Sequence, residues 1–331
     1  NKKYSLKPMS EILSKELNQT VIFSSSCVGE EAIKKKNSLK EGEVLLLENL
    51  RFHKSEEKND IEFSKNLSLG CDMYVNDAFS CSHRNHSSIT GVTDFLPSFF
   101  GIHLKKEIDA LENVLVDPKK PVVSIIGGSK VSTKIGIISN LLKKMDYIVI
   151  GGAMANTFLA AMGNKIGKSL YEKEVLGIAN EILEKGSKNN CKFILPEDVI
   201  LSKKLEKNSK TLNVDINSIP DDMMALDIGE KTVNNIKKVV DDCKTLLWNG
   251  PLGAFEVNPF DNGTNEVAKI VSTKTKEKSL ISVAGGGDTI SALNNAGVTD
   301  NFSYVSTAGG AFLEWLEGKR LPGISVLHKQ N

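Results

Sequence analysis

The chain has 331 residues, about twice the length of a typical single domain, so we expect two domains. Hydrophobic residues make up 40% of the sequence and charged residues 25%, and the formal net charge of +1 gives no reason to expect a nucleic acid or a membrane surface as partner. Five cysteines without a CxxC pair argue against a disulfide framework and favour a reducing compartment. No apolar run approaches the ~18 residues of a membrane span.

The first hundred residues contain few recognisable strand–helix units. The segments "GEVLLLENLRF" and "CDMYVNDAF" are typical of strands with polar ends, and "FSKNLSLG" is typical of a helix. Each strand is followed by a loop arginine, Arg51 or Arg84, in a chain with three arginines among its 42 basic residues. A guanidinium group binds phosphate or carboxylate through two parallel hydrogen bonds, so these residues are either surface charges or ligands of one small anionic molecule.

The segment after residue 100 is predicted to form one helix that bridges two domains. It reads "GIHLKKEIDALENVLVDPKKP" over residues 101–121 and is closed by Pro118 and Pro121.

From residue 121 onward, short apolar runs alternate with helical stretches. The runs are continuously apolar, as expected for parallel strands that are covered on both faces. This order predicts a doubly wound α/β domain, whose ligands bind beyond the carboxyl ends of the strands. The runs are "PVVSIIGG", "YIVIGG", "FILPED", "MALDIG", "TLLWNG", "LISVAGG" and "FSYVSTAGG".

One of these runs ends in three glycines, Gly285, Gly286 and Gly287, followed by Asp288 and Thr289. A strand that passes through glycines into a helix leaves free N–H groups at the helix N-terminus, where they and the helix dipole favour a phosphate. Asp288 either caps this helix or holds Mg²⁺ against the phosphate. The alternative is an ordinary glycine turn with an aspartate cap.

A second strand end adds two lysines. In "SIIGGSKVSTKIGII", Gly127 and Gly128 end the strand, and Ser129 is predicted to cap a helix that carries Lys130 and Lys134 on one face. The helix dipole disfavours cations in this first turn, so the two lysines suggest an anionic ligand. The alternative is a pair of solvated lysines in a lysine-rich chain.

A third strand end, "LLWNGPLGAFE", would place Asn249, Pro251 and Glu256 beside a ligand. Two motif resemblances are rejected. The segment "GNKIGKS" has three residues between its glycines where a P-loop has four, and no GxGxxG follows a predicted strand, which argues against a nicotinamide-dependent dehydrogenase. The spacing of Cys71, Cys81, His83 and His86 fits no standard zinc site.

Taken together and in order, these segments closely resemble phosphoglycerate kinase over essentially the whole chain. The matching segments are "YSLKP", "LLENLRFH", "VNDAFSCSHRNHSS", "GGSKVSTKIG", "GGAMANTFL", "DIGEKT", "WNGPLGAFE", "GGGDT" and "FSYVSTAGGAFLEWLEGKRLPG". The resemblance implies two doubly wound, Rossmann-like parallel-sheet domains joined by a helix, the first of them incomplete. It implies phosphoryl transfer between 1,3-bisphosphoglycerate and ADP, giving 3-phosphoglycerate and ATP in glycolysis. It further implies a cytoplasmic monomer that uses Mg²⁺ and binds neither nucleic acid nor membrane.

The resemblance also divides the chain. Residues 1–100 would be the remainder of a phosphoglycerate-binding domain, 101–117 the interdomain helix, 118–308 the nucleotide-binding domain, and 309–331 a segment that returns to the first domain. The family's substrates lie on separate domains, so we expect hinge bending to close the cleft.

The site residues follow from the matched motifs. Arg51 and Arg84 would bind phosphoglycerate. Lys134 would follow the transferring phosphoryl group with Lys130 assisting, and the backbone of Gly287, Gly309 and Gly310 would donate hydrogen bonds near it. The nucleotide site would comprise Gly127, Gly128, Lys130, Lys134, Gly152, Asn249, Pro251, Glu256, Gly285, Gly286, Gly287, Asp288 and Thr289, with Asp288 on Mg²⁺.

This inventory suits the implied reaction. An attacking carboxylate is already ionised and needs no general base, so positioning and charge neutralisation carry the catalysis. Four residues depart from the family pattern: Ser129 replaces Ala, Asn156 an aromatic residue, Glu230 Pro, and Ala308 Gly.

The sequence opens at Asn1, without the family's first segment and the catalytic arginine that this segment carries. We therefore expect the chain to begin inside a larger protein and to be inactive, or nearly so, on its own. The alternative function is a nucleotide-binding fragment without transferase activity.

Overall fold

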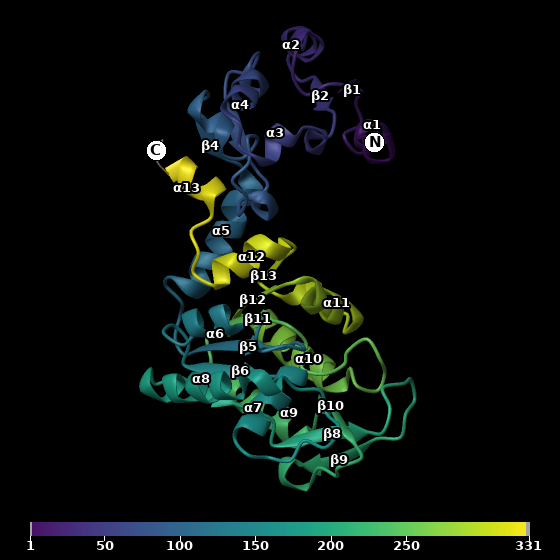
Figure 1. The fold of residues 1–331 in the computed structure, drawn as a ribbon, viewed down its shortest axis with the longest axis vertical. Coiled ribbons are helices and arrows are strands. Elements are labelled where there is room, and N and C mark those ends of the chain that lie inside the picture. Colours follow the sequence, from purple (N-terminus) through teal and green to yellow (C-terminus); the bar gives the residue numbers. More distant parts are fainter. Residues whose placement is uncertain (1, 329–331) are drawn as a thin grey trace. The chain divides into compact units, whose positions relative to one another are not determined.

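The computed structural model describes residues 2–328, and the chain divides into two compact units. The first unit runs to Lys105 and resumes at Arg320, and the second comprises Lys106–Lys319. The helix α5 (Ile102–Leu115) therefore begins in the first unit and ends in the second. Figure 1 follows the chain through both units.

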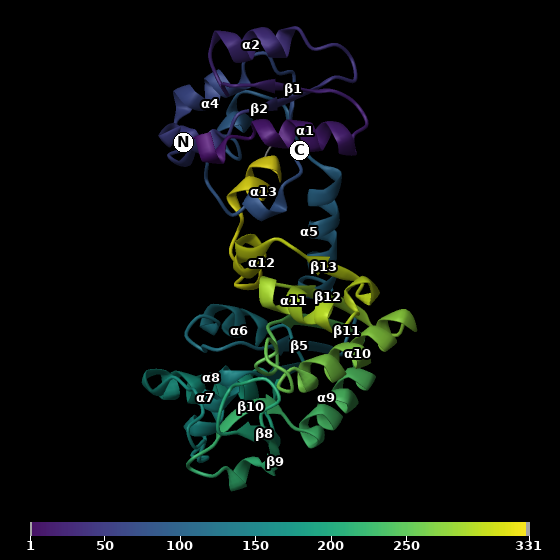
Figure 2. The ribbon, with the colours of Figure 1, turned by 90° about the vertical axis from the view of Figure 1, so that its right-hand side faces the viewer.

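The second unit is built on a six-stranded parallel sheet of order β13-β12-β11-β5-β6-β7. This sheet confirms the doubly wound α/β fold class. Figure 2 shows α6, α7 and α8 along one side of the sheet and α9 and α10 along the other. The strands are β5 (Val122–Ile126), β6 (Tyr147–Ile150), β7 (Lys192–Ile194), β11 (Thr245–Asn249), β12 (Ile281–Gly285) and β13 (Tyr304–Ser306).

The helices of this unit follow from their apolar spacing. In α9, Ile236, Val239 and Val240 recur at intervals of three and four residues, and all three are buried. They pack against strand residues such as Trp248, which is fully buried in the core of the unit. The helices are α6 (Ile135–Leu141), α7 (Ala153–Ala161), α8 (Leu176–Lys188), α9 (Glu230–Asp242), α10 (Asn262–Lys276), α11 (Gly287–Asn295) and α12 (Gly309–Leu316).

One predicted strand does not belong to the parallel sheet. The run "MALDIG" forms β10 (Met224–Ile228), which pairs antiparallel with β8 (Asp198–Ser202). A third strand, β9 (Leu212–Asp215), completes a separate three-stranded antiparallel sheet. The prediction of seven parallel strands was therefore wrong for this run. A short apolar stretch indicates a buried strand but not the direction of its partner.

The first unit contains two parallel strand pairs. The strand β1 (Val21–Ser24) pairs with β2 (Val44–Leu47), and β3 (Tyr74–Asn76) pairs with β4 (Ser98–Phe100). A small core of Cys27, Phe63, Leu67 and Val92 packs between the elements. The helices are α1 (Lys7–Glu16), α2 (Glu30–Asn37), α3 (Lys54–Glu57), α4 (Ile61–Ser68) and α13 (Pro322–His328), with short 3₁₀ turns at Lys2–Tyr4, Leu50–Phe52, Phe79–Cys81 and Gly91–Asp94.

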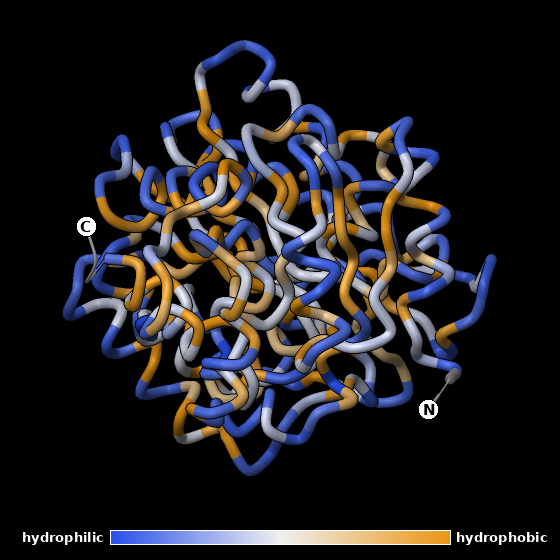
Figure 3. The backbone as a smooth tube through the Cα atoms, turned by 90° about the horizontal axis from the view of Figure 1, so that it is seen from above, coloured by the Kyte–Doolittle hydropathy of each residue, from blue (hydrophilic) through white to orange (hydrophobic). Residues whose placement is uncertain are grey.

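The buried hydrophobic core of the second unit is formed mainly by residues of its strands and helices, and many outer loops are hydrophilic (Figure 3). Among the described residues 2–328, no helix is long and apolar enough to cross a bilayer.

Candidate active site

The glycine turn between β12 and α11 is held by two polar side chains. Asn249, the last residue of β11, donates from Nδ2 to the carbonyl oxygen of Gly285 at 2.7 Å. The Thr289 hydroxyl donates to the same carbonyl at 2.9 Å and accepts the N–H of Gly250 at 2.7 Å. Both side chains are buried, so the turn is fixed from beneath and its outer face stays open.

Gly286 is required at this turn for two reasons. Its φ of +98° lies in the left-handed region that L side chains rarely adopt, and an added Cβ would lie 2.6 Å from Asn249 Nδ2. Gly286 is also the N-cap of α11, so the exposed Asp288 lies in the first helical turn and does not cap it. This corrects one of the two roles expected for Asp288, and it leaves the carboxylate free to face a cation.

Lys134 lies in the segment after β5 and reaches Asn249 at the end of the neighbouring strand β11. Its ammonium group donates a hydrogen bond to Oδ1 of Asn249. Burial lowers the pKa of Lys134 to about 8, although the nearby Asp288 carboxylate raises it. The lysine charge is thus poorly solvated, a condition under which an incoming anion is attracted strongly.

The sequence predicts Lys130 and Lys134 on one face of a helix, and this prediction is wrong. The helix α6 begins at Ile135, so Lys134 is its N-cap, and the exposed Lys130 and Ser129 lie in the preceding turn. Glycines allow this turn to approach the third strand end. An added Cβ on Gly127 would lie 1.9 Å from the carbonyl oxygen of Pro251.

A pocket of about 330 Å³ opens between these loops. Gly128, Gly152, Pro251, Glu256 and Asp288 all line it, so the structure brings these predicted residues together. Its other walls are largely apolar, and sequence reasoning missed them because single apolar residues after strands carry no motif. The remaining lining residues are Ser129, Ala153, Leu170, Leu205, Met224, Ala225, Leu226, Gly253, Ala254 and Phe255.

Gly309 and Gly310 form the first turn of α12 and are exposed. The N-cap before them is Ala308, whose φ of −90° is an ordinary backbone angle for a residue with a Cβ. The replacement of the family's glycine at this position therefore imposes no backbone strain.

The other departures from the family pattern are also accommodated. Asn156 is buried in α7, and its Nδ2 donates to the carbonyl oxygen of Leu170 at 3.1 Å. Glu230 opens α9, where the helix dipole favours an acid. Ser129 is exposed.

The donor set at the turn suits Mg²⁺ that arrives with a nucleotide. Mg²⁺ is usually held by one or two carboxylates together with substrate phosphates. Asp288 is a single exposed carboxylate beside helix N–H groups, and within residues 2–328 no cluster of three metal-ligating side chains occurs. The site therefore fits a cation that is carried by phosphate oxygens and does not resemble a cage built by the protein alone.

In the first unit, Arg51 lies in the turn after β2 and contacts His86. The Arg51 Nη1 atom is 2.7 Å from His86 Nδ1 and 3.8 Å from a carboxylate oxygen of Glu56. Burial lowers the pKa of His86, and the charges of Arg51 and then Arg84 lower it further. Both guanidinium groups thus act on the same imidazole, and both arginines are exposed to solvent. His53 packs against the ring of Phe63.

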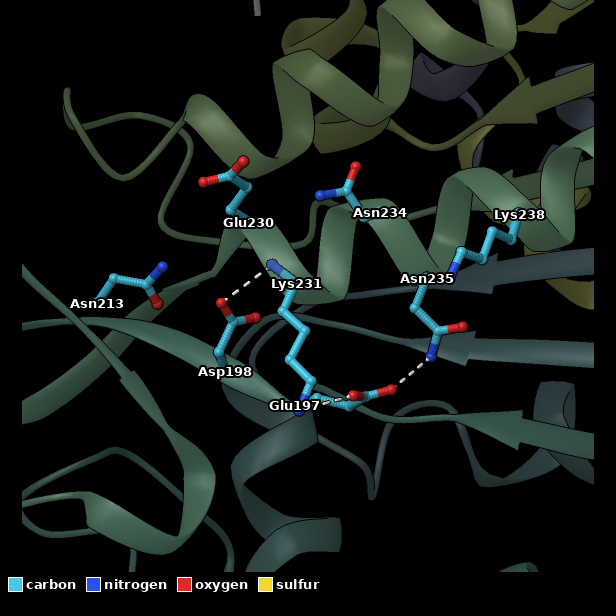
Figure 4. Close-up of a pocket in the computed structure, with 8 residues that line it drawn as sticks. All are labelled: Glu197, Asp198, Asn213, Glu230, Lys231, Asn234, Asn235 and Lys238. Atoms are coloured by element: carbon cyan, nitrogen blue, oxygen red, sulfur yellow. Dashed lines mark hydrogen bonds and ion pairs between the residues drawn. The ribbon is translucent and has the colours of Figure 1, made fainter.

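Another pocket, of about 510 Å³, surrounds the first turn of α9 (Figure 4). The Asp198 carboxylate accepts the backbone N–H groups of Lys231 at 3.0 Å and Thr232 at 2.8 Å and so occupies the helix N-terminus. The Lys231 ammonium group is 3.1 Å from Glu197. The charged groups at the centre of this pocket therefore pair with one another.

Comparison with known proteins points to one family over nearly the whole chain. The family model described as phosphoglycerate kinase matches residues 1–319. The chain is 52% identical over 325 residues to the phosphoglycerate kinases of Chelativorans sp. (strain BNC1) and Brucella melitensis biotype 1, covering 98% of this chain and 82% of each relative.

Two solved structures share the fold. The phosphoglycerate kinase of Coxiella burnetii superposes with a TM-score of 0.93 at 40% identity, and covers 100% of this chain and 82% of that one. The enzyme of Pyrococcus horikoshii OT3 gives a TM-score of 0.81 at 30% identity, and covers 98% and 82%.

These likenesses favour the glycolytic kinase hypothesis over a nucleotide-binding fragment, and they lend no support to the expectation that the chain is inactive alone. The chain belongs to the phosphoglycerate kinase family.

Proposed function

We propose that this chain transfers a phosphoryl group between 1,3-bisphosphoglycerate and ADP, giving 3-phosphoglycerate and ATP. The observation that carries the proposal is the contact of Lys134 with Asn249, which itself holds Gly285 in the glycine turn. Three strand ends thereby bring a cation, an amide and helix N–H groups together next to Asp288, which lines the pocket. This combination suits the phosphates of a nucleotide.

The roles of the nucleotide-site residues follow from their chemistry. The N–H groups around Gly286 and Gly287 would donate to phosphate oxygens, and the apolar walls near Leu226 and Phe255 would contact the base. Glu256 and Asn249 would accept or donate at the polar edge of the nucleotide. Lys130 would add charge at the phosphates, with Gly127, Gly128, Gly152 and Pro251 shaping the loops.

Lys134 would act on the transferring group itself. A poorly solvated ammonium group stabilises the negative charge that spreads over the equatorial oxygens during transfer. The Gly310 N–H would donate to the same group. Mg²⁺, held by Asp288 and the nucleotide, would neutralise phosphate charge when bound. The acceptor carboxylate is already ionised, so no side chain is needed as general base.

The first unit would bind the phosphoglycerate through Arg51 and Arg84, which act together on His86. Two guanidinium groups offer paired donors to a phosphate or a carboxylate. We infer in addition a monomeric cytoplasmic enzyme, which is in keeping with five free cysteines and with the glycolytic role of the family.

A coupled assay of 1,3-bisphosphoglycerate-dependent ATP formation tests the proposal, with Lys134→Met beside the unchanged chain. We expect turnover by the chain and a loss of about 100-fold or more in kcat for the variant, because one preorganised donor to the transferring group is removed. Equal turnover by the two proteins would contradict the role of Lys134. No turnover by either would contradict the transferase and would restore the expectation that the chain is inactive alone.

A further inference from the structure

The turn that carries Lys130 and Lys134 is held by a carboxylate from a distant part of the sequence. Glu172, which lies forty residues further along the chain in the segment before α8, accepts the Ser132 backbone N–H at 3.0 Å and the Ser132 hydroxyl at 2.5 Å through its two oxygens. The backbone N–H of Val131 is also near enough to this carboxylate to help lower its pKa.

The carboxylate is itself anchored. The backbone N–H of Glu172 donates to the hydroxyl of Thr157 at 3.1 Å, and Thr157 is fully buried in α7. Asn156, the residue before Thr157, donates a hydrogen bond from Nδ2 to the carbonyl oxygen of Leu170. Two neighbouring side chains of α7 thus fix the segment that presents Leu170 to the nucleotide pocket and Glu172 to the lysine turn.

The charge state of Glu172 agrees with this role. Burial by itself would raise the pKa of Glu172, but the hydrogen bonds from Ser132 and Val131 and the nearby Lys130 charge lower it below its usual range. The group therefore stays ionised near neutral pH and accepts both donors of Ser132. Hydrogen bonds to a charged acceptor are among the stronger ones in proteins.

The turn has few other means of holding its shape before α6. The Lys134 N–H donates to the carbonyl oxygen of Val131 at 2.8 Å, and the Val131 side chain is fully buried. The Ser132 N–H, by contrast, donates to Glu172. A bidentate carboxylate at this point sets the direction in which the turn leaves Gly128 and thereby the place from which Lys134 reaches Asn249.

We propose that Glu172 is a positioning residue for the phosphoryl-transfer site, which holds the Lys130–Lys134 turn so that the Lys134 ammonium group stays hydrogen-bonded to Asn249. The inference rests on the proposed function, because it assigns the purpose of the turn to binding the nucleotide phosphates. Glu172 itself would not touch the nucleotide. It would act through the depressed pKa and the fixed position of Lys134.

The test is calorimetric titration with Mg-ADP at pH 8, in two buffers of different ionisation enthalpy, on the unchanged chain and on Glu172→Ala, Glu172→Gln and Lys134→Ala. We expect Glu172→Ala to weaken ADP affinity about tenfold, the scale of hydrogen bonds to a charged group. We also expect it to lower the number of protons taken up on binding, because a loosened Lys134 is better solvated and already protonated. Glu172→Gln keeps the side-chain volume and one acceptor oxygen. Its ADP affinity and proton uptake should therefore lie between those of the unchanged chain and those of Glu172→Ala.

Glu174→Ala is the matched control, because this exposed glutamate lies two residues further on and should leave affinity and proton uptake unchanged. An affinity change in Glu172→Ala without a change in proton uptake would indicate a merely structural role and overturn the inference. If Lys134→Ala weakens binding while Glu172→Ala does not, the inference fails alone. If neither Lys134→Ala nor Glu172→Ala weakens ADP binding, both the inference and the proposed function are contradicted. Should Glu172→Ala not fold, the same criteria apply to Glu172→Gln and Ser132→Ala.

Discussion

Lys134 and Asn249 are 115 residues apart in the sequence, and they meet through a hydrogen bond from the lysine ammonium group to the amide Oδ1. The same amide donates from Nδ2 to Gly285, so one side chain ties the lysine to the glycine turn. A half-buried cation beside free helix N–H groups attracts phosphate strongly. The proposed phosphate site depends on this contact between Lys134 and Asn249.

The first prediction concerns the proton on Lys134. Its pKa of about 8 means that the ammonium group is partly neutral at pH 8, and phosphate binding should raise the pKa again. We expect Mg-ADP binding at pH 8 to take up about half a proton at this site. Calorimetry in buffers of different ionisation enthalpy measures this number. Lys134→Arg, which stays protonated, should bind with little uptake, and an unchanged uptake in that variant would rule out Lys134 as its source.

The second prediction concerns the glycine turn. Gly286→Ala places a Cβ 2.6 Å from Asn249 Nδ2 at a φ of +98°, so the turn must open. We expect a loss of about 1–3 kcal/mol in the free energy of unfolding together with weaker ADP binding. Chemical denaturation and calorimetry measure the two effects. Gly177→Ala, in α8 with open space around its Cα, is the control and should be neutral or slightly stabilising; equal behaviour of both variants would contradict the strained turn.

The third prediction concerns a buried acid behind the pocket. Burial raises the pKa of Asp227 to about 8, although the N–H groups of Gly263 and Ile228 donate to it. Between the usual pKa near 3.8 and about 8, the folded state holds the proton more tightly than the unfolded chain. The stabilising contribution of Asp227 is therefore complete below pH 3.8 and is lost as the pH rises through 8. Urea denaturation from pH 5 to 8 should show a shallower decline for Asp227→Asn than for the unchanged chain, and parallel declines would refute it.

The fourth prediction concerns the arginines of the first unit. Arginine is only a donor, so the 2.7 Å contact requires a lone pair on Nδ1 of a neutral His86. Burial lowers the pKa of His86 first and the charge of Arg51 lowers it further, so Arg51→Met should raise it. NMR titration of the imidazole protons follows this pKa. Arg320→Met, at an exposed position, serves as the control, and an unmoved His86 titration in Arg51→Met would show that the charge is not felt.

Much of the second unit could be predicted from the sequence, because continuous apolar runs that end in glycine are typical of parallel strands. The helix α10 begins and ends where the pattern "NGTNEVAKIVSTKTK" does. The glycine turn at Gly285 was recognisable because glycine is needed where the backbone must take positive φ or approach another chain segment closely. At these positions the residue types themselves determine the local backbone conformation.

The features that could not be predicted from the sequence are those that depend on contacts between segments far apart along the chain. The antiparallel pairing of β10 with β8 is a property of the sheet and not of either segment. The start of α6 at Ile135 was misplaced because Glu172 and the burial of Val131 hold the preceding turn outside the helix. The apolar walls at Leu205 and Phe255 come from loops without a periodic pattern.

The most direct test of the nucleotide site is a calorimetric titration of the chain with Mg-ADP beside the double variant Lys134→Ala, Asp288→Ala. Lys143→Ala removes an exposed lysine of the same unit and controls for net charge. We expect saturable binding by the unchanged chain and by the control, and a loss of at least about 100-fold in affinity for the double variant, because two charge-assisted contacts disappear. Equal affinity in all three proteins, with circular dichroism showing each to be folded, would contradict it.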